Sequence, residues 1–220
     1  YINQMADLCE KVGADVHDVA RGIGLDKRIG SKFLHPGPGY GGSCFPKDTL
    51  ALVETARLSK TSISLVETVV KYNQKRKSDM ADKIIGILKN DYENKKISIL
   101  GLAFKPETDD MRDSPCLDII PRLQEKGIKI SAFDPVAMNQ AKQMLKDIEF
   151  AKDLESCLKN SDAIVVLTEW NEFRSLSPTQ LTGIMKGNKI IDLRNALNSK
   201  IFEGSQFDLI QIGRSNQTSQ

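Results

Sequence analysis

Short apolar runs alternate with helical patterns through the second half of the chain, and this alternation limits the possible folds more than any other feature. The run at 163–167 is almost wholly apolar, as expected for a strand buried on both faces of a parallel sheet. Strands that alternate with helices indicate βαβ units, so the sequence predicts an α/β fold with a Rossmann-like, doubly wound parallel sheet. Strands are predicted at 96–101, 129–133, 163–167, 189–193 and 207–212, and helices at 114–126, 139–146 and 178–185.

The first half has a helical pattern, with apolar residues recurring every three or four positions. Gly13 is placed to end a first helix, and Asp15 can cap a short second helix that runs through Ala20. A loop is predicted at 28–42, after which Pro46 suits the first turn of another helix. We therefore expect a helical domain to precede the sheet.

A stretch with few helix breakers, 63–89, joins the two halves. Apolar residues lie near both of its ends, whereas 71–83 is polar. One long helix that connects two bodies is the expected structure, and two helices broken near Ser78 are the alternative. The predicted division is a helical central domain at 1–90 followed by the sheet domain at 91–220.

Composition excludes several classes of protein. The 220 residues are 40% hydrophobic and 27% charged, as in soluble globular chains, and no apolar run is long enough to span a membrane. A net charge of +2 gives no reason to expect a nucleic-acid partner. Because the chain opens inside a helical pattern and without a methionine, we expect it to be the middle of a longer protein.

The chain has four cysteines, Cys9, Cys44, Cys116 and Cys157, and their spacing matches no zinc or redox pattern. Reduced thiols in a cytoplasmic protein, with no metal site, are therefore expected. Cys9, Cys116 and Cys157 lie in helical contexts and are expected to be small buried hydrophobes.

The segment HPGPGYGGSCFPKD, from His35 to Asp48, is the strongest candidate for a functional site. Glycines allow a backbone to approach a ligand closely, and exposed amides can hold an anion. Cys44 precedes a predicted helix start, where the helix dipole favours a thiolate, and Asp48 lies one helical turn further on. A thiolate and a carboxylate on one face suit covalent catalysis followed by the attack of water. Glycines that only form turns are the alternative.

The end of the first predicted strand, 101–105, lacks the glycine spacing of a dinucleotide-binding fingerprint. The sheet is therefore not expected to hold NAD, although another nucleotide could bind outside the carboxyl ends of the strands. Asp134, at the end of the second strand, is interpreted as part of a turn with Pro135 rather than as a ribose ligand. The acidic residues of 109–113 are interpreted as an exposed turn rather than as metal ligands.

Several segments resemble the UDP-glucose/GDP-mannose dehydrogenase family, and within it the UDP-glucose 6-dehydrogenases. The segment 37–48 closely resembles the catalytic stretch of those enzymes, and 26–30 resembles the part upstream of it. The segment 101–115 resembles the start of their nucleotide-sugar domain, and 191–195 a late strand end. The likeness covers nearly the whole chain, and the residues at 43–48 favour UDP-glucose over N-acetylated UDP-sugars.

The resemblance implies an NAD-dependent, two-step oxidation of UDP-glucose to UDP-glucuronate. Cys44 would add to the intermediate aldehyde as a thiohemiacetal, and hydride loss would leave a thioester that water hydrolyses. Asp48 would assist the proton transfers. NAD would be bound mainly by an N-terminal domain that nothing in this chain matches, with contacts from Cys44, Lys47 and Arg112.

The resemblance also implies a substrate site and a homodimer formed through the central helices. Residues 1–90 would carry the dimer contacts and the catalytic cysteine, and 91–220 would bind the UDP-sugar. Arg28 would reach the substrate across the dimer interface. The substrate-binding residues implied are Arg28, His35, Pro36, Gly37, Pro38, Gly39, Tyr40, Gly41, Phe104, Lys105 and Arg194.

Other interpretations stay open at this point. The chain alone is expected to be inactive, because hydride transfer needs a nicotinamide held against the substrate. It could instead be a UDP-sugar-binding or dimerisation module without catalysis, or part of a dehydrogenase of a related UDP-sugar. An unrelated thiol enzyme ranks last, since such enzymes usually pair the cysteine with a histidine and only His35 lies nearby.

Overall fold

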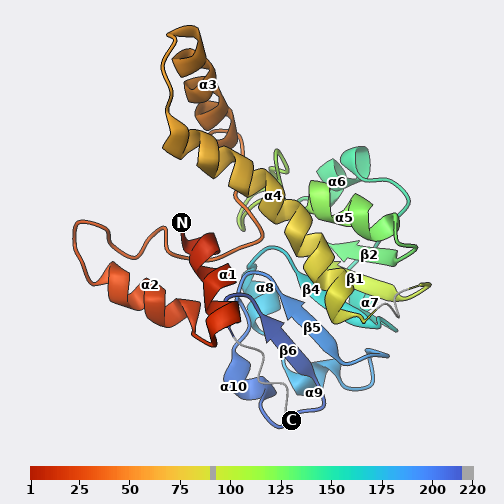
Figure 1. The fold of residues 1–220 in the computed structure, drawn as a ribbon. Helices are drawn as coiled ribbons and strands as arrows, with labels where there is room; N and C mark the ends of the chain where they lie inside the picture. Colours follow the sequence, from red (N-terminus) through yellow and green to blue (C-terminus); the bar gives the residue numbers. More distant parts are fainter. Residues whose placement is uncertain (90–92, 215–220) are drawn as a thin grey trace.

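The second half of the chain forms the predicted sheet, and all of its strands run parallel (Figure 1). The computed structural model describes residues 1–89 and 93–214. The strands are β1 (Lys96–Leu100), β2 (Lys129–Phe133), β3 (Glu149–Phe150), β4 (Ala163–Val166), β5 (Lys189–Asp192) and β6 (Asp208–Gln211). Their order is β3-β2-β1-β4-β5-β6. The chain thus builds outward from β1 in one direction and then in the other, which makes the sheet doubly wound.

Each face of the sheet has its own apolar core. The helices around it are α4 (Ser64–Ile87), α5 (Cys116–Gln124), α6 (Met138–Met144), α7 (Leu154–Leu158), α8 (Asn171–Arg174), α9 (Pro178–Leu181) and α10 (Ser199–Phe202). Ile99 and Val165 face the core shared with α4, α5 and α6, whereas Leu100, Ile164 and Val166 face the core shared with α7 to α10. Because successive residues of a strand point to opposite faces, a strand between two cores is apolar throughout.

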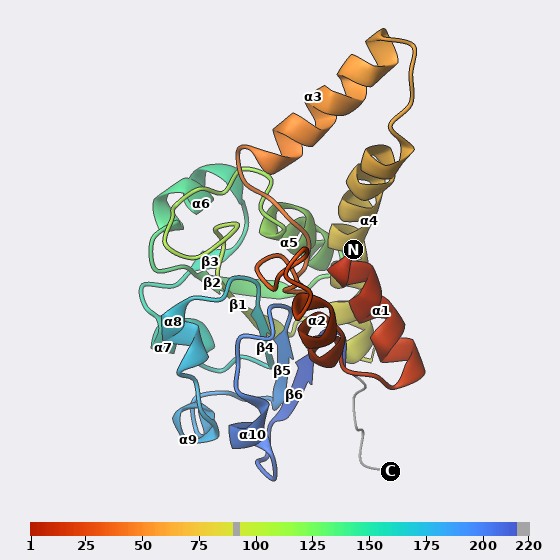
Figure 2. The same ribbon diagram turned by 90° about the vertical axis from the view of Figure 1, so that its left-hand side faces the viewer.

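One unbroken helix, α4, joins the two halves over 24 residues. The alternative of a break near Ser78 is therefore wrong. The second half of α4 packs on the sheet through Met80, Ala81 and Ile84. Its first half projects from the body as a hairpin with α3 (Phe45–Leu58), as two perpendicular views show (Figures 1 and 2). The helix thus belongs to the core of the sheet and is more than a connection.

Two N-terminal helices lie beside the sheet and share a small core of their own. They are α1 (Ile2–Val12) and α2 (Val16–Gly24). Gly13 ends α1 with a left-handed φ of 76°, and Asp15 caps α2 by accepting a backbone N–H at 2.8 Å, both as predicted. The N–H of Val16 donates to the carbonyl of Gly213 at 2.8 Å, so the helices are joined to the chain just beyond β6.

The sequence does not predict β3, α7, α8 or α10, since elements of two to five residues are too short to show a period. It also misplaces two helix ends: α9 stops at Leu181 and α2 continues to Gly24. The proposed division between residues 90 and 91 falls outside the described residues. None of the helices in 1–89 and 93–214 is both long and apolar enough to cross a membrane.

Gly101, just after β1, offers a test of how closely the chain beyond β1 packs against Thr168, just after β4. Its φ is 92°, and a Cβ there would lie 2.4 Å from the Cβ of Thr168. We expect Gly101→Ala to lower the free energy of unfolding by roughly 2–4 kcal/mol, through backbone strain and overpacking. Gly183 has a φ of 81° but open space around it, so Gly183→Ala should cost only about 1 kcal/mol. Urea unfolding measures both, and equal losses would contradict the close approach of Thr168.

Candidate active site

The residues around Cys44 form the start of α3, as the sequence predicts. Cys44 is the N-cap residue of this helix and is exposed. The N–H of Asp48 donates to the carbonyl of Cys44 at 2.8 Å, so the two residues are one helical turn apart. Lys47 pairs with the carboxylate of Asp48 at 3.2 Å, and the hydroxyl of Ser43 lies 3.7 Å from the sulfur of Cys44. A thiol and a carboxylate thus share one exposed turn.

The loop that leads to Cys44 is packed, although it is rich in glycine and proline. Residues 36–39 are all buried. The N–H of Gly37 donates to Oδ1 of Asn3 at 2.8 Å, and its carbonyl accepts from Nε of Arg76 at 2.7 Å. The backbone N–H and carbonyl of Tyr40 both pair with the side-chain amide of Asn73. Side chains of α1 and α4 therefore fix the path of this loop.

A second loop, which follows β1, reaches the same place. The N–H of Gly42 donates to the carbonyl of Arg112 at 2.7 Å. A Cβ on Gly42 would lie 2.8 Å from the ring of Phe104, and a Cβ on Gly41 would lie 2.3 Å from the carbonyl oxygen of Asp113. These approaches explain the pair of adjacent glycines, and they bring Phe104 and Arg112 beside the start of α3.

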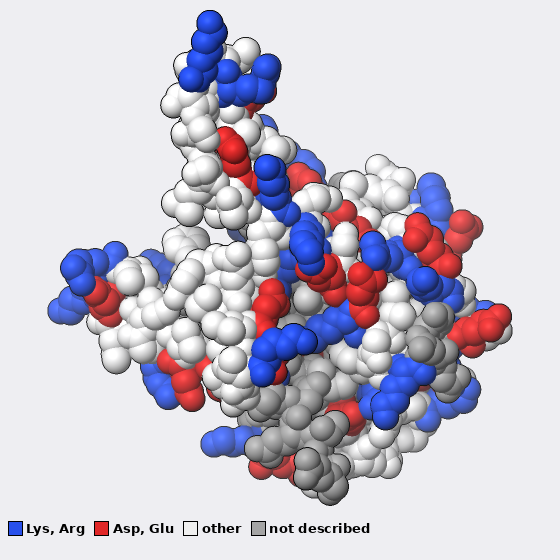
Figure 3. Space-filling model, viewed as in Figure 1, with Lys and Arg blue, Asp and Glu red and all other residues white. Residues whose placement is uncertain are grey.

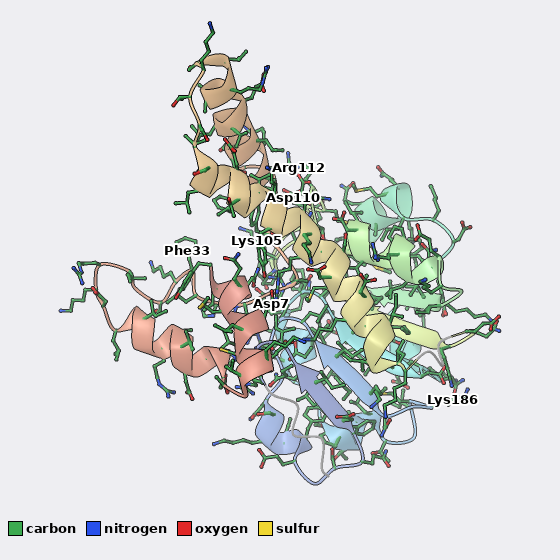
Figure 4. All side chains as sticks on the ribbon, viewed as in Figure 1. Asp7, Phe33, Lys105, Asp110, Arg112 and Lys186 are labelled. Atoms are coloured by element: carbon green, nitrogen blue, oxygen red, sulfur yellow. The ribbon has the colours of Figure 1, made fainter. Side chains whose placement is uncertain are left out.

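Charged side chains of this second loop gather near the base of the α3–α4 hairpin, where Figure 4 labels Lys105, Asp110 and Arg112. Nζ of Lys105 lies 5.4 Å from the centre of the Phe104 ring. Nε and one Nη of Arg112 donate to the Asp110 carboxylate at 2.9 Å each, which lowers the pKa of that carboxyl. Asp110 raises the pKa of Arg112 most, and Cys44 adds a smaller increase. Arg112 therefore lies within electrostatic reach of the thiol.

Arg194 lies beneath the loop that leads to Cys44, residues 35–43, which we call the glycine-rich loop. Its Nε donates to the carbonyl of Leu167 at 2.7 Å and one Nη donates to that of Phe104 at 2.9 Å. Glu169 is its ion-pair partner at 3.3 Å, and burial lowers the pKa of Arg194. Its other Nη would be 3.1 Å from a Cβ on Gly37. Arg194 thus connects the ends of β1 and β4 to the loop, and its role in substrate binding stays a prediction.

Not all predicted site residues come together within one chain. The side chain of Arg28 is 88% exposed and pairs with Asp26 at 2.6 Å, in the loop beyond α2 that extends away from the body (Figure 1). His35 is also exposed, at the start of the glycine-rich loop. The contacts gathered around Cys44 include neither residue. Within 1–89 and 93–214, no group of three His, Cys, Asp or Glu side chains could hold a metal ion.

Sequence reasoning missed the α4 side chains that hold the loop. Asn73, Arg76 and Lys77 belong to the stretch that the sequence marks only as polar, and all three are buried. They continue the stripe of Met80 and Ala81 at helical spacing. That period was the available signal that this part of the helix faces inward.

Asp134 has a larger role than the predicted turn. Its carboxylate is fully buried and accepts from the N–H groups of Leu102 at 2.7 Å and Ala103 at 3.0 Å. Nε1 of Trp170 donates to it at 3.2 Å, and two N–H groups of the following turn donate to its other oxygen. In a dinucleotide-binding domain, backbone N–H groups just beyond the first strand face the pyrophosphate. Here an internal carboxylate occupies them.

Comparison with known proteins identifies the family. Residues 1–75 match the model of the UDP-glucose/GDP-mannose dehydrogenase family, central domain, and residues 98–199 match that of the same family's UDP binding domain. The chain belongs to this family. It spans about half the length of the curated relatives that it matches.

The relatives and the structural neighbours agree with this assignment. The UDP-glucose 6-dehydrogenase of Rhizobium meliloti (strain 1021) is 50% identical over 97% of this chain and 49% of its own length. That of Rickettsia prowazekii (strain Madrid E) is 43% identical over 97% of this chain and 50% of its own. The NDP-N-acetyl-D-galactosaminuronic acid dehydrogenase of Methanosarcina mazei Go1 has a TM-score of 0.86 at 28% identity, covering 100% of this chain and 48% of that one. The UDP-glucose dehydrogenase of Pyrobaculum islandicum has a TM-score of 0.79 at 30% identity, covering 89% and 44%.

Thiol labelling tests the contrast between Cys44 and the other cysteines, which are buried as predicted. Burial raises the pKa of Cys116 to about 12 and that of Cys157 to about 11, and it also raises that of Cys9. At pH 8 we expect iodoacetamide to modify Cys44 roughly 100-fold faster than the other three, because only thiolates react. Mass spectrometry should show that Cys44→Ser removes the fast phase and that Cys9→Ser keeps it. Rapid labelling of a second cysteine would contradict the burial of Cys9, Cys116 and Cys157.

Proposed function

We propose that the chain is the part of an NAD-dependent UDP-glucose 6-dehydrogenase that carries the catalytic cysteine and the UDP-sugar site. The observation that carries this proposal is the exposed Cys44 at the point where the glycine-rich loop meets Phe104 and Arg112. A nucleophilic side chain at a junction of loops, above the carboxyl ends of a parallel sheet, is where such folds place their ligands. The names of the relatives support UDP-glucose as the substrate.

The reaction oxidises the C6 alcohol of the glucose to a carboxylate. NAD, when bound, accepts the hydride of each of the two oxidations. In the first oxidation the C6 carbon loses a hydride and its hydroxyl loses a proton to water, which leaves an aldehyde. The Cys44 thiolate then adds to the aldehyde carbon and the aldehyde oxygen takes a proton, which gives a thiohemiacetal. Loss of the second hydride and of that proton leaves a thioester. Water then adds to the carbonyl carbon and the C–S bond breaks, which returns the thiolate and forms UDP-glucuronate.

The side chains around Cys44 have distinct proposed tasks. Cys44 is the nucleophile, and Asp48, one turn away, takes protons from the attacking water. Phe104 and Lys105 contact the substrate, with Lys105 paired to a phosphate. The sugar and diphosphate would lie along the loop residues His35, Pro36, Gly37, Pro38, Gly39, Tyr40 and Gly41, with Arg194 beneath them.

The sheet of this chain does not fit NAD. The end of β1 lacks the glycine spacing, and Asp134 already accepts from the N–H groups of Leu102 and Ala103. We therefore propose that NAD is bound mainly by an N-terminal domain outside this chain, with contacts from Cys44, Lys47 and Arg112. On this proposal the chain alone is inactive, and it divides into the domains 1–90 and 91–220.

A homodimer through the central helices completes the proposal. The α3–α4 hairpin exposes four leucines that are between 50% and 79% accessible, namely Leu50, Leu52, Leu58 and Leu65. Exposed apolar side chains in this number favour a protein contact. Arg28, remote from the Cys44 of its own chain, would then serve the site of the other subunit. Lys and Arg are interspersed with Asp and Glu on the face in Figure 3, so this face offers no extended basic patch for a nucleic acid or a membrane. We propose a cytoplasmic protein without such partners.

Calorimetric titration of the chain tests the substrate site. We expect UDP-glucose to bind and NAD not to bind. Lys105→Ala should weaken UDP-glucose binding roughly tenfold, because a charge-assisted bond to a phosphate is lost. Lys152→Ala, at an exposed lysine that pairs with Asp153, is the matched control and should bind as the unmodified chain does. Binding of NAD in place of UDP-glucose would contradict the proposal, and tighter binding of an N-acetylated UDP-sugar would point to a dehydrogenase of that sugar.

The same samples test whether the reaction needs a separate NAD-binding domain. When the chain, UDP-glucose and NAD are mixed, we expect no increase in absorbance at the NADH band, because the proposal assigns most of the NAD contacts to a separate domain and hydride transfer needs the nicotinamide held against the sugar. Formation of NADH by the chain alone would refute the role assigned to a separate NAD-binding domain.

A further inference from the structure

Two residues of the glycine-rich loop, Gly37 and Tyr40, are each held by side chains at both their N–H and their carbonyl group. The N–H of Gly37 donates to Oδ1 of Asn3 at 2.8 Å, and its carbonyl accepts from Nε of Arg76 at 2.7 Å. The N–H of Tyr40 donates to Oδ1 of Asn73 at 2.8 Å, and its carbonyl accepts from Nδ2 of the same residue at 3.0 Å. The segment 37–40 is therefore fixed at both of its ends.

The residues that make these bonds are themselves immobilised. Arg76 is only 1% exposed, and its Nη1 donates to the carboxylate of Asp7 on α1 at 2.7 Å. The hydroxyl of Tyr72 donates to the other carboxylate oxygen of Asp7. Burial and this hydrogen bond raise the pKa of Tyr72 to about 12, so the hydroxyl keeps its proton at neutral pH. Helices α1 and α4 thus jointly hold the loop in place at Gly37.

Lys77 connects the loop to the segment that carries Phe104 and Arg112. Its side chain is 4% exposed, and its Cγ would lie 3.0 Å from a Cβ on Gly39. Its Nζ donates to the carbonyl of Asp113 at 3.0 Å and pairs with Asp118 at 3.1 Å. One side chain of α4 thus touches both of the loops that meet at the start of α3.

A purely structural helix has no need of these three polar residues. Apolar side chains at the same positions would extend the stripe of Met80 and Ala81, whereas buried polar groups are costly unless each finds a partner. Nη2 of Arg76 is buried without a hydrogen-bond partner among the described residues. The partners of Asn73 and of Nε of Arg76 are backbone groups of a loop that forms no helix or strand of its own. The bonds therefore determine the conformation of the loop.

We propose that Asn73, Arg76 and Lys77 are positioning residues, which order the loop before the ligand arrives and thereby set the affinity for the sugar nucleotide. The inference rests on the proposed function of the loop. A loop that is already in its binding conformation loses less conformational entropy when the ligand binds. Without the three side chains, the ligand itself would have to order the segment 37–40.

The central experiment compares Asn73→Ala with Lys75→Ala, at an exposed lysine of the same helix that pairs with Asp79. In Asn73→Ala we expect the Tyr40 amide to exchange with deuterium at least about 100-fold faster, because its acceptor is gone. We expect UDP-glucose affinity to fall about tenfold, because the loop must be ordered on binding. In both variants the amide of Ile84, where α4 packs on the sheet, should keep its protection. Lys75→Ala should match the unmodified chain in Tyr40 exchange and in UDP-glucose affinity.

Two further variants separate positioning from simple destabilisation. Asn73→Asp keeps an acceptor for the Tyr40 N–H but loses the donor to the Tyr40 carbonyl, so it should restore only part of the protection. Lys77→Met preserves the apolar stem but loses the bond to the Asp113 carbonyl, and it should weaken UDP-glucose binding more than Lys75→Met does at an exposed position. If these variants bind UDP-glucose in proportion to their thermal stability instead, the positioning role is overturned.

The outcomes also distinguish this inference from the function on which it rests. Faster Tyr40 exchange with unchanged UDP-glucose affinity would show that the bonds are structural only and would overturn the proposal. Failure of the unmodified chain to bind UDP-glucose would refute the proposed function instead. The exchange data would then still test whether α4 orders the glycine-rich loop. Unchanged Tyr40 exchange in Asn73→Ala would overturn that ordering, and faster exchange would support it.

Discussion

Buried backbone groups must be hydrogen-bonded, and the glycine-rich loop is buried without belonging to a helix or strand. Its partners therefore have to come from elsewhere, and α1 and α4 supply them through Asn3, Asn73 and Arg76. This requirement explains why polar residues interrupt the apolar stripe of α4 midway along its length. The same helix connects the loop to the sheet, since α4 bonds to the loop through Asn73 and Arg76 and packs on the sheet through Met80 and Ala81.

The same rule governs the end of β1. The N–H groups of Leu102 and Ala103 point beyond the sheet edge, where other nucleotide-binding domains present such groups to a pyrophosphate. In this chain they donate to the buried carboxylate of Asp134. The backbone N–H groups at this place are already satisfied, so a phosphate bound here, as the proposed function requires, would have to be met by cationic side chains. Lys105 and Arg112 lie on the loop that follows, close to the start of α3.

The sequence predicts those features that depend on local patterns. Gly13 and Asp15 mark helix ends, the wholly apolar run of β4 marks a strand between two cores, and Cys44 next to Pro46 marks an exposed helix start. Such signals act over a few residues, so a single sequence carries them. The elements it misses, β3 and α8 among them, are too short for a period to develop.

The contacts that build the site are of another kind. Arg76 meets Gly37 across 39 residues of sequence, and Asp134 meets Leu102 across 32. The type of a polar residue on a helix does not show whether it faces water or a buried loop. Only the position of Asn73 and Arg76 in line with the apolar stripe could have shown that they face inward. Two adjacent glycines are likewise ambiguous until the ring of Phe104 and the carbonyl of Asp113 are seen to occupy the space beside them.

The position of Cys44 combines an exposed sulfur with a fixed backbone, two properties that usually exclude each other. A buried thiol stays protonated, as at Cys116, where burial raises the pKa to about 12. A thiol on a mobile segment keeps its access to water but has no fixed relation to a ligand. Cys44 stands where a packed loop ends and an exposed helix begins, so its backbone is fixed by the contact of Gly42 with Arg112 while its sulfur stays open. Rigidity in the residues before the thiol and exposure at the thiol itself thus follow from one arrangement.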